Sequence, residues 1–122
     1  MRKKILVIDD DSDILEILGL LLTGEGYEVK TLIHGDSVFE SIRDFQPDLI
    51  LLDVMLAGMD GRAICKDIKE NKLTYSIPVI LISGTHDLKH LLHLPGAPND
   101  FIAKPFDIAI LLDGIERQLV AC

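Results

Sequence analysis

Short apolar runs alternate along the chain with longer segments in which apolar residues recur at helical spacing. Turn residues such as glycine, proline and aspartate separate the two kinds of segment. The short runs, which we predict to be strands, are Ile5–Ile8, Tyr27–Ile33, Leu49–Leu52, Ile77–Ile82 and Phe101–Ala103. Alternating strands and helices are typical of a parallel sheet covered by helices. The sequence therefore predicts one α/β domain over residues 1–122.

About five helices are expected between and after these strands. We place their starts near Ser12, Ser37, Gly61 and Asp87 and after Pro105, with Asp36–Ser37 as a cap for the second helix. Their apolar faces are expected to carry Ile14, Leu15, Leu18, Leu21 and Leu22; Val38, Phe39, Ile42 and Phe45; Ala63, Ile64 and Ile68; and Ile108, Leu111, Leu112, Ile115 and Leu119.

Right-handed connections between parallel strands have to cover both faces of such a sheet. The predicted fold is a flavodoxin-like, doubly wound sheet of five parallel strands in the order 2-1-3-4-5. Where the winding direction reverses, a crevice opens beyond the carboxyl ends of the strands. We therefore expect the functional residues at those ends.

Charge and cysteine content limit the possible partners and the compartment. Twelve Lys and Arg against twenty Asp and Glu leave a net charge of −8, which disfavours direct contact with nucleic acid or an anionic membrane. The apolar runs are too short to span a bilayer, and no cleavage site follows the basic N-terminus. Cys65 and Cys122 are too few for a disulfide framework. We expect a cytoplasmic protein.

Polar residues follow four of the predicted strands. Asp9 and Asp10 come after the first strand, Asp53 after the third, Ser83 after the fourth and Lys104 after the fifth. If the first and third strands are neighbours, three carboxylates converge, and two charges 4 Å apart repel by about 4 kcal/mol at an effective dielectric near 20. A cation is therefore expected among them. Carboxylate oxygens and water suit Mg²⁺, which also binds phosphate oxygens well.

Asp53 is the best candidate for a nucleophile. It closes an apolar strand, and the loop Val54–Asp60 that follows can leave its carboxylate accessible. A carboxylate that attacks a phosphoryl group forms an acyl phosphate, and the charge on the transferred oxygens then has to be neutralised. Mg²⁺, the ammonium of Lys104 and the hydroxyl of Ser83 can each take one oxygen.

Several short motifs share their order and separation with a known family. They are Val7–Asp11, the apolar strand that ends at Asp53, Met59–Gly61, Ile82–Gly84 and Lys104–Phe106. Together they resemble the receiver domains of bacterial two-component response regulators, and the likeness covers nearly the whole chain. It implies a phosphoacceptor that assists its own phosphorylation and dephosphorylation but is not an enzyme. The partners implied are a histidine kinase or histidine phosphotransfer protein and a downstream protein or effector domain.

The resemblance also assigns roles to individual residues. It implies that Asp53 is the phosphoacceptor, that Asp9 and Asp10 hold Mg²⁺ directly or through water, and that the backbone carbonyl of Met55 completes the metal site. A further pair, Ser83 and Phe101, corresponds to the hydroxyl and aromatic switch positions. The family usually has a cis peptide bond before the proline in Lys104–Pro105.

Three features depart from the family pattern. Ala57 stands where proline is common, so the loop after Asp53 is expected to be less rigid. The usual polar fourth helix is replaced by the stretch 85–95, and Pro98–Asn99 alters the segment before the fifth strand. Phe101 lacks the hydroxyl of a tyrosine, so only packing can favour one of its positions.

Simpler interpretations exist for the same residues. The aspartates 9–11 can cap the first helix, and for Asp11 a cap or loop role is the better prediction. Lys104 taken alone is a solvated lysine and Ser83 a strand-end hydroxyl, so their roles depend on the cluster. Phe101 can be a core aromatic. For Cys65 we predict buried packing.

A further group, His86, His90 and His93, shares one helical face. Such spacing can chelate a metal, but a solvated or partly packed face is the simpler prediction.

Two other classes of function fit the same fold. The first is a cofactor carrier or an enzyme. A flavin carrier needs a phosphate loop after the first strand, where Asp9–Asp11 would repel phosphate. A phosphatase with an aspartyl intermediate needs a substrate-recognition insertion, for which the fold leaves no room in 122 residues. A docking module that is never phosphorylated remains the second alternative. Whether the chain acts alone or is part of a longer protein stays open.

Overall fold

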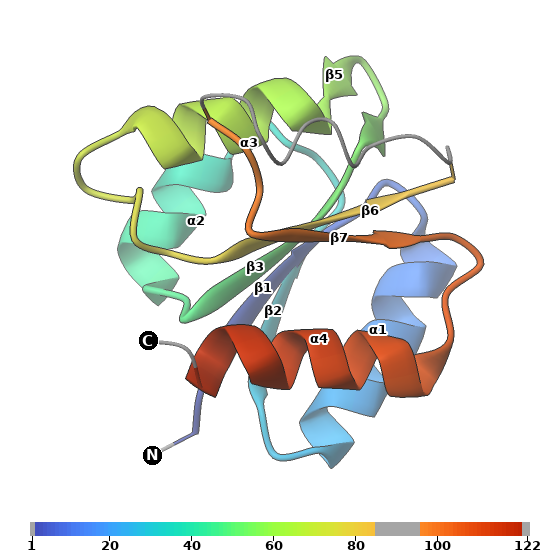
Figure 1. The fold of residues 1–122 in the computed structure, drawn as a ribbon. Helices are drawn as coiled ribbons and strands as arrows, with labels where there is room; N and C mark the ends of the chain where they lie inside the picture. The colour runs from blue at the N-terminus through green and yellow to red at the C-terminus, as the bar shows by residue number, and fades with distance from the viewer. Residues whose placement is uncertain (1, 85–95, 121–122) are drawn as a thin grey trace.

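The computed structural model describes residues 2–84 and 96–120 (Figure 1). Five parallel strands form one sheet: β1 (Lys4–Ile8), β2 (Glu28–Leu32), β3 (Leu49–Asp53), β6 (Val79–Ser83) and β7 (Asp100–Ala103). Their order is β2-β1-β3-β6-β7, which confirms the predicted order because β6 and β7 are the fourth and fifth strands of this sheet. The short strands β4 (Met55–Leu56) and β5 (Met59–Asp60) form a separate antiparallel pair.

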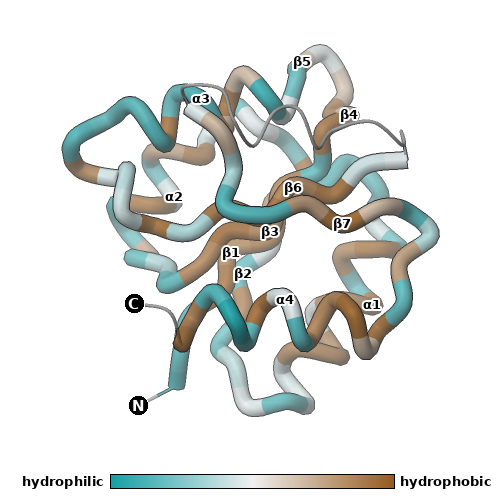
Figure 2. Tube along the Cα trace, in the orientation of Figure 1, coloured by the Kyte–Doolittle hydropathy of each residue, from teal (hydrophilic) through white to brown (hydrophobic). Residues whose placement is uncertain are grey.

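Helices of the described residues cover both faces of the sheet, α2 and α3 on one side and α1 and α4 on the other (Figure 1). They are α1 (Ser12–Gly24), α2 (Val38–Phe45), α3 (Gly61–Glu70) and α4 (Ile108–Val120). The buried side chains of α2 and α3 form one apolar cluster with one face of the strands, and those of α1 and α4 form a second cluster with the other face. The strands therefore form the apolar centre and hydrophilic residues lie on the outer surface, as Figure 2 shows. This arrangement is the doubly wound fold that the alternation predicted.

The register of the sheet brings distant polar residues to one edge. Ile8 of β1 pairs with Leu52 of β3, so Asp9 and Asp53, the next residues, emerge side by side. On the other side of β3, Asp53 itself pairs with Ile82 of β6. Parallel strands all end at the same edge. The candidate residues at the carboxyl ends are therefore neighbours in space although they lie far apart in the chain.

Three residues predicted for apolar helix faces are instead exposed. Phe39 is 40% exposed, Ala63 is exposed, and Ile108 is 51% exposed. The sheet-facing side of α2 is defined by Val38 and Ile42, which turns Phe39 away from the sheet. Ile108 is the first residue of α4, ahead of the part of the helix that packs on the sheet. For Phe39 and Ala63 the prediction was wrong because three or four apolar residues do not define the direction of a short helical face.

Other local predictions had mixed outcomes. Ser37 occupies the cap position of α2, but its side chain makes no capping hydrogen bond within the described part of the chain. The loop after Asp53, expected to be less rigid because of Ala57, contains the hydrogen-bonded pair β4–β5. Leu56 of this pair is buried in the core and anchors it. The helix expected near Asp87 lies outside the described residues.

Candidate functional site

Three carboxylates gather at the carboxyl edge of the sheet. One oxygen atom from each of Asp9, Asp10 and Asp53 lies within 4.8 Å of the other two. Asp9 and Asp53 are buried, with 1% and 4% of their surface exposed, whereas Asp10 is exposed. All three belong to the ends of the adjacent strands β1 and β3. The cluster offers oxygen ligands of the kind that a hard divalent cation takes, with one side open to water.

Lys104 provides the only positive charge that the described residues place against the two buried carboxylates. Its Nζ atom lies 3.1 Å from Oδ2 of Asp9, to which it donates a hydrogen bond, and 3.4 Å from Oδ2 of Asp53. Its backbone N–H donates to the carbonyl oxygen of Ser83 at 2.7 Å, which ties it to the end of β6. The peptide bond between Lys104 and Pro105 is cis, as the resemblance implied.

The charges of the site shift each other's protonation. Burial raises the pKa of the Asp53 carboxyl and the nearby carboxylate of Asp9 raises it further, while Lys104 and the N–H of Met55 offset part of this rise. Burial by itself lowers the pKa of Lys104, but its hydrogen bond to Asp9 and the charge of Asp53 outweigh burial, so its pKa is raised. The lysine is therefore held in its charged form, and it does not fully compensate the two carboxylates.

Backbone N–H groups orient the carboxylates. The N–H of Asp11 donates to Oδ1 of Asp9 at 2.9 Å, and the N–H of Met55 donates to Oδ1 of Asp53 at 3.3 Å. Asp11 is the N-cap of α1, since its Oδ1 accepts from the N–H groups of Asp13 and Ile14. The cap prediction for Asp11 is confirmed. Asp9 does not cap the helix in this way. Its Oδ1 accepts from the N–H of Asp11, which precedes the helix, and its Oδ2 accepts from Lys104.

The remaining predicted site residues lie around this cluster. Ser83 is fully buried at the end of β6, next to the residue that pairs with Asp53. Met55 follows Asp53 by two residues, and its peptide N–H lies against the carboxylate while its side chain is exposed. Phe101 of β7 is partly buried and packs against the apolar cluster on the α2 and α3 side. The structure thus places all the predicted residues at or beside one edge.

Gly61 belongs to this site as well, although its role was not predicted. A Cβ atom on Gly61 would come within 2.1 Å of the backbone carbonyl oxygen of Asp53. The only signal in the sequence was a glycine at the predicted first residue of a helix, within the motif Met59–Gly61. Close contacts between two backbones leave no pattern of apolar residues that a sequence could reveal.

Two other predictions concern residues away from the cluster. Cys65 is buried as predicted, its Sγ lies 3.7 Å from the carbonyl oxygen of Gly96, and burial raises its pKa to about 11, so it is a packing residue. The histidines 86, 90 and 93 lie outside the described residues. Among residues 2–84 and 96–120, no helix has the length and apolar character needed to cross a bilayer.

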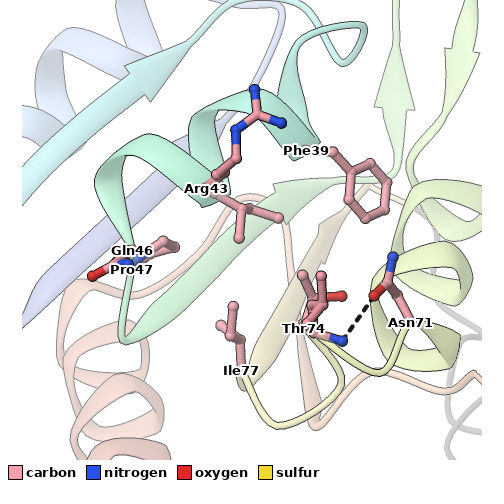
Figure 3. Close-up of a pocket in the computed structure, with 9 residues that line it drawn as sticks. Phe39, Arg43, Gln46, Pro47, Asn71, Thr74 and Ile77 are labelled. Carbon is pink, nitrogen blue, oxygen red and sulfur yellow. Dashed lines mark hydrogen bonds between the residues drawn. The ribbon is translucent and has the colours of Figure 1, made fainter.

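A cavity of about 440 Å³ lies between α2 and the loop that joins α3 to β6 (Figure 3). Its walls include Gln46 and Pro47, which precede β3, and Ile77, which precedes β6. In its wall the backbone N–H of Leu73 donates to the side-chain oxygen Oδ1 of Asn71 at 2.8 Å, and the N–H of Thr74 donates to the backbone carbonyl oxygen of Asn71 at 3.1 Å. Residues that precede parallel strands lie at the amino edge of the sheet. The cavity is therefore at the opposite edge from the carboxylates and is not part of the candidate site.

Comparison with known proteins gives consistent matches. Residues 5–116 match the family described as response regulator receiver domain. The DNA-binding response regulator MtrA of Mycobacterium tuberculosis (strain ATCC 25618 / H37Rv) is 35% identical over 120 residues, which cover 98% of this chain and 51% of that protein. MtrA of Mycobacterium leprae (strain TN) is also 35% identical, with 52% of its length covered. The chain thus spans about half the length of the curated relatives it matches.

Solved structures of response regulator receiver domains have the same fold. A putative response regulator from Chloroflexus aurantiacus has a TM-score of 0.89 and 30% identity, with 98% of this chain and 99% of that chain covered. The receiver domain of NtrX from Brucella abortus has a TM-score of 0.85 and 36% identity, with 97% and 99% covered. The signal receiver domain of a histidine kinase from Syntrophus aciditrophicus has a TM-score of 0.87 and 30% identity, with 98% and 91% covered. This chain belongs to the response regulator receiver domain family.

Proposed function

We propose that Asp53 accepts a phosphoryl group from a histidine kinase or a histidine phosphotransfer protein, in a reaction that depends on Mg²⁺, and that phosphorylation changes partner binding. The observation that carries this proposal is the position of the Lys104 ammonium between two buried carboxylates, 3.1 Å from Asp9 and 3.4 Å from Asp53, in a cluster that Asp10 completes. An ordinary ion pair needs one carboxylate. Three carboxylates with one lysine suit a site that also takes a metal ion and a phosphoryl group.

The reaction transfers the phosphoryl group between two protein side chains. A carboxylate oxygen of Asp53 forms a bond to phosphorus while the bond from phosphorus to the donor histidine nitrogen breaks, and the freed imidazole takes up a proton from solvent. The N–H of Met55 holds the other oxygen and thereby orients the attacking one.

The donor set fits a magnesium ion. The ligands in the proposal are carboxylate oxygens of Asp9, Asp10 and Asp53 and the backbone carbonyl of Met55, with water in the remaining positions. A bound Mg²⁺ supplies positive charge next to the transferred oxygens. The side chain oxygens that would hold it come from one exposed and two buried aspartates, so the ion can enter from solvent.

Three further residues take part in the proposal. Lys104 moves its hydrogen bond from the carboxylates to a phosphoryl oxygen, and the Ser83 hydroxyl binds another oxygen. As Ser83 turns toward the phosphoryl group, Phe101 packs inward into the space that is vacated. Phe101 is only partly buried against the apolar cluster, so an inward turn would bury more of its ring.

The proposed output is a change in protein contacts, without catalysis on an outside substrate. Relatives named as DNA-binding response regulators are about twice as long as this chain. The charge of −8 favours docking to a protein or effector domain over direct contact with nucleic acid. A cytoplasmic setting is part of the same proposal, in line with Cys65 being a free, buried thiol.

Intact-mass spectrometry after incubation with acetyl phosphate tests the assignment. We expect one phosphoryl adduct that forms only with Mg²⁺ and that is lost in Asp53→Ala. Asp113→Ala is the matched control, because Asp113 is an exposed aspartate in an ion pair on α4. An adduct on the Asp53→Ala variant would contradict the assignment, and the absence of any adduct on the wild type would favour a module that works by docking alone.

A further inference from the structure

Gly61, the first residue of α3, lies directly against the backbone of the proposed phosphoacceptor. A Cβ atom on Gly61 would come within 2.1 Å of the carbonyl oxygen of Asp53, and within 2.9 Å of its carbonyl carbon and of the Cα atom of Val54. The N–H of Gly61 donates a hydrogen bond to the carbonyl oxygen of Val54 at 2.8 Å. Gly61 is itself buried. The start of α3 and the end of β3 therefore touch through backbone atoms alone.

Neither backbone can move away freely. Asp53 ends a strand that is buried along its whole length between β1 and β6, and the N–H of Val54 donates to the carbonyl oxygen of Ile82 at 3.0 Å. On the other side, α3 is anchored in the core by the buried side chains of Ile64, Cys65 and Ile68. Cβ atoms essentially never lie within 3.0 Å of such neighbours. A side chain at position 61 therefore has to displace one backbone by roughly 1 Å.

We propose that Gly61 is a positioning residue for phosphorylation: its missing side chain lets α3 start against the Asp53 backbone and so holds the Asp53 carboxylate in reach of Lys104. The inference rests on the proposed function. The same contact closes the base of the β4–β5 hairpin, because the chain leaves the sheet after Asp53 and returns at Gly61. The hairpin begins with Met55, whose N–H orients the carboxylate. A displacement at Gly61 therefore moves both the backbone of Asp53 and the Met55 N–H that orients its carboxylate.

The test is Gly61→Ala, with the maximal rate of adduct formation measured at saturating Mg²⁺ and acetyl phosphate. We expect the rate to fall by about a hundredfold, the typical effect of an ångström-scale displacement of a reacting group. Gly19→Ala is the matched control, because Gly19 is also helical and nothing lies within 4 Å of a Cβ atom there. That control is expected to keep the wild-type rate.

Gly35→Ala separates contact with the backbone from contact with side chains. The three atoms nearest to a Cβ atom on Gly35 belong to the ends of flexible side chains, with Cδ1 of Ile64 at 2.6 Å, Sδ of Met59 at 3.1 Å and Cδ1 of Leu56 at 3.2 Å. These ends can move aside, so we expect the rate to change by about threefold at most. A larger effect for Gly35→Ala than for Gly61→Ala would contradict the inference.

Circular dichroism at the assay temperature distinguishes positioning from stability. If Gly61 only stabilised the fold, the Gly61→Ala substitution would lower the melting temperature but leave the maximal rate of the folded protein unchanged. An unchanged maximal rate for folded Gly61→Ala therefore overturns the inference while the proposed function stands. If the wild type forms no adduct, the proposed function fails first, so the two failures are distinguishable.

A second pair of variants applies if Gly61→Ala does not fold. Asp60 is the N-cap of α3: its Oδ1 accepts from the N–H of Arg62 at 2.9 Å, and its Oδ2 lies 2.7 Å from Nη2 of Arg62. Asp60→Ala loosens the first turn of α3 without adding volume, and we expect the maximal rate to fall by about fivefold. Asp113→Ala removes a comparable exposed pair with Arg117 from α4 and is expected to have no effect. Equal rates for the two variants would overturn the inference.

Discussion

Asp53 lies in surroundings that disfavour its charge. It is almost fully buried, and burial followed by the repulsion from Asp9 raises its pKa, against the smaller opposing effects of Lys104 and the Met55 N–H. A carboxyl whose pKa is higher in the folded than in the unfolded state binds more protons when folded. The free energy of unfolding then decreases as the pH rises through that pKa. Without a metal ion, the charged carboxylate therefore destabilises the fold at neutral pH.

Asp53→Asn is expected to raise the free energy of unfolding at neutral pH in the presence of EDTA by about 1 kcal/mol, because the amide removes the charge and keeps the shape. The gain should vanish in acid, where the wild-type carboxyl is protonated in both states. Urea unfolding across this pH range measures the difference. Asp113→Asn, in an exposed pair, serves as the control. A less stable Asp53→Asn variant at neutral pH would mean that Lys104 outweighs burial.

Lys104 partly neutralises the two buried carboxylates. Lys104→Gln leaves Asp9 and Asp53 buried without their cation, so we expect the free energy of unfolding to fall by about 1–3 kcal/mol in EDTA. Arg117→Gln removes a cation from an exposed pair and should cost less than about 0.5 kcal/mol. Equal losses in urea unfolding would contradict the interpretation of Lys104 as a partner of buried charge.

At the scale of elements, each helix is held by one face. In α1 the buried residues Leu15, Leu18 and Leu22 recur at spacings of three and four, and this periodicity predicted the helix and its orientation. Short helices were harder to orient. In α2 and α3 the exposed Phe39 and Ala63 were assigned to the apolar face, because a few apolar residues fit several directions of a short helix. Contact with the sheet decides among these directions.

Two leucines of α1 test this account. Leu18 is fully buried and Leu20 is 72% exposed, although both belong to the same helix and have the same helix propensity. We expect Leu18→Ala to lower the free energy of unfolding by about 2–5 kcal/mol because it leaves a cavity, and Leu20→Ala to change it by less than about 0.5 kcal/mol. Chemical denaturation measures both. Similar losses would mean that α1 is packed in another orientation.

At the scale of the whole molecule, the functional edge carries unfavourable charge that a bound cation can relieve. The buried carboxylates at the ends of β1 and β3 lie close together, and the single charge of Lys104 neutralises their negative charge only in part. Binding of Mg²⁺ to the folded state alone would then stabilise the entire domain. The metal site and the stability of the fold are thermodynamically linked in this way.

Addition of Mg²⁺ at a hundred times its dissociation constant is expected to raise the free energy of unfolding by about 2.7 kcal/mol. Asp10→Ala should reduce this gain, whereas Asp13→Ala, an exposed aspartate in the first turn of α1, should retain it. Thermal melting with Mg²⁺ and with EDTA gives the comparison. An equal gain in both variants would remove Asp10 from the ligand set.

The amino-acid pattern alone determined the strands and the edge at which the polar residues lie, because buried parallel strands need apolar runs and all end at the same edge. The strand order came from the likeness to a flavodoxin-like sheet, and the pairing of β1 with β3 confirmed it. It also singled out Asp9, Asp10, Asp53, Ser83 and Lys104, since carboxylates and a lysine after apolar strands have no packing role. Only the tertiary structure decided which charges face each other and that α3 begins against the Asp53 backbone at Gly61. Those features depend on distances between segments that are far apart in the chain. A contact between two backbones, such as that of Gly61 with Asp53, leaves no pattern of side chains in the sequence.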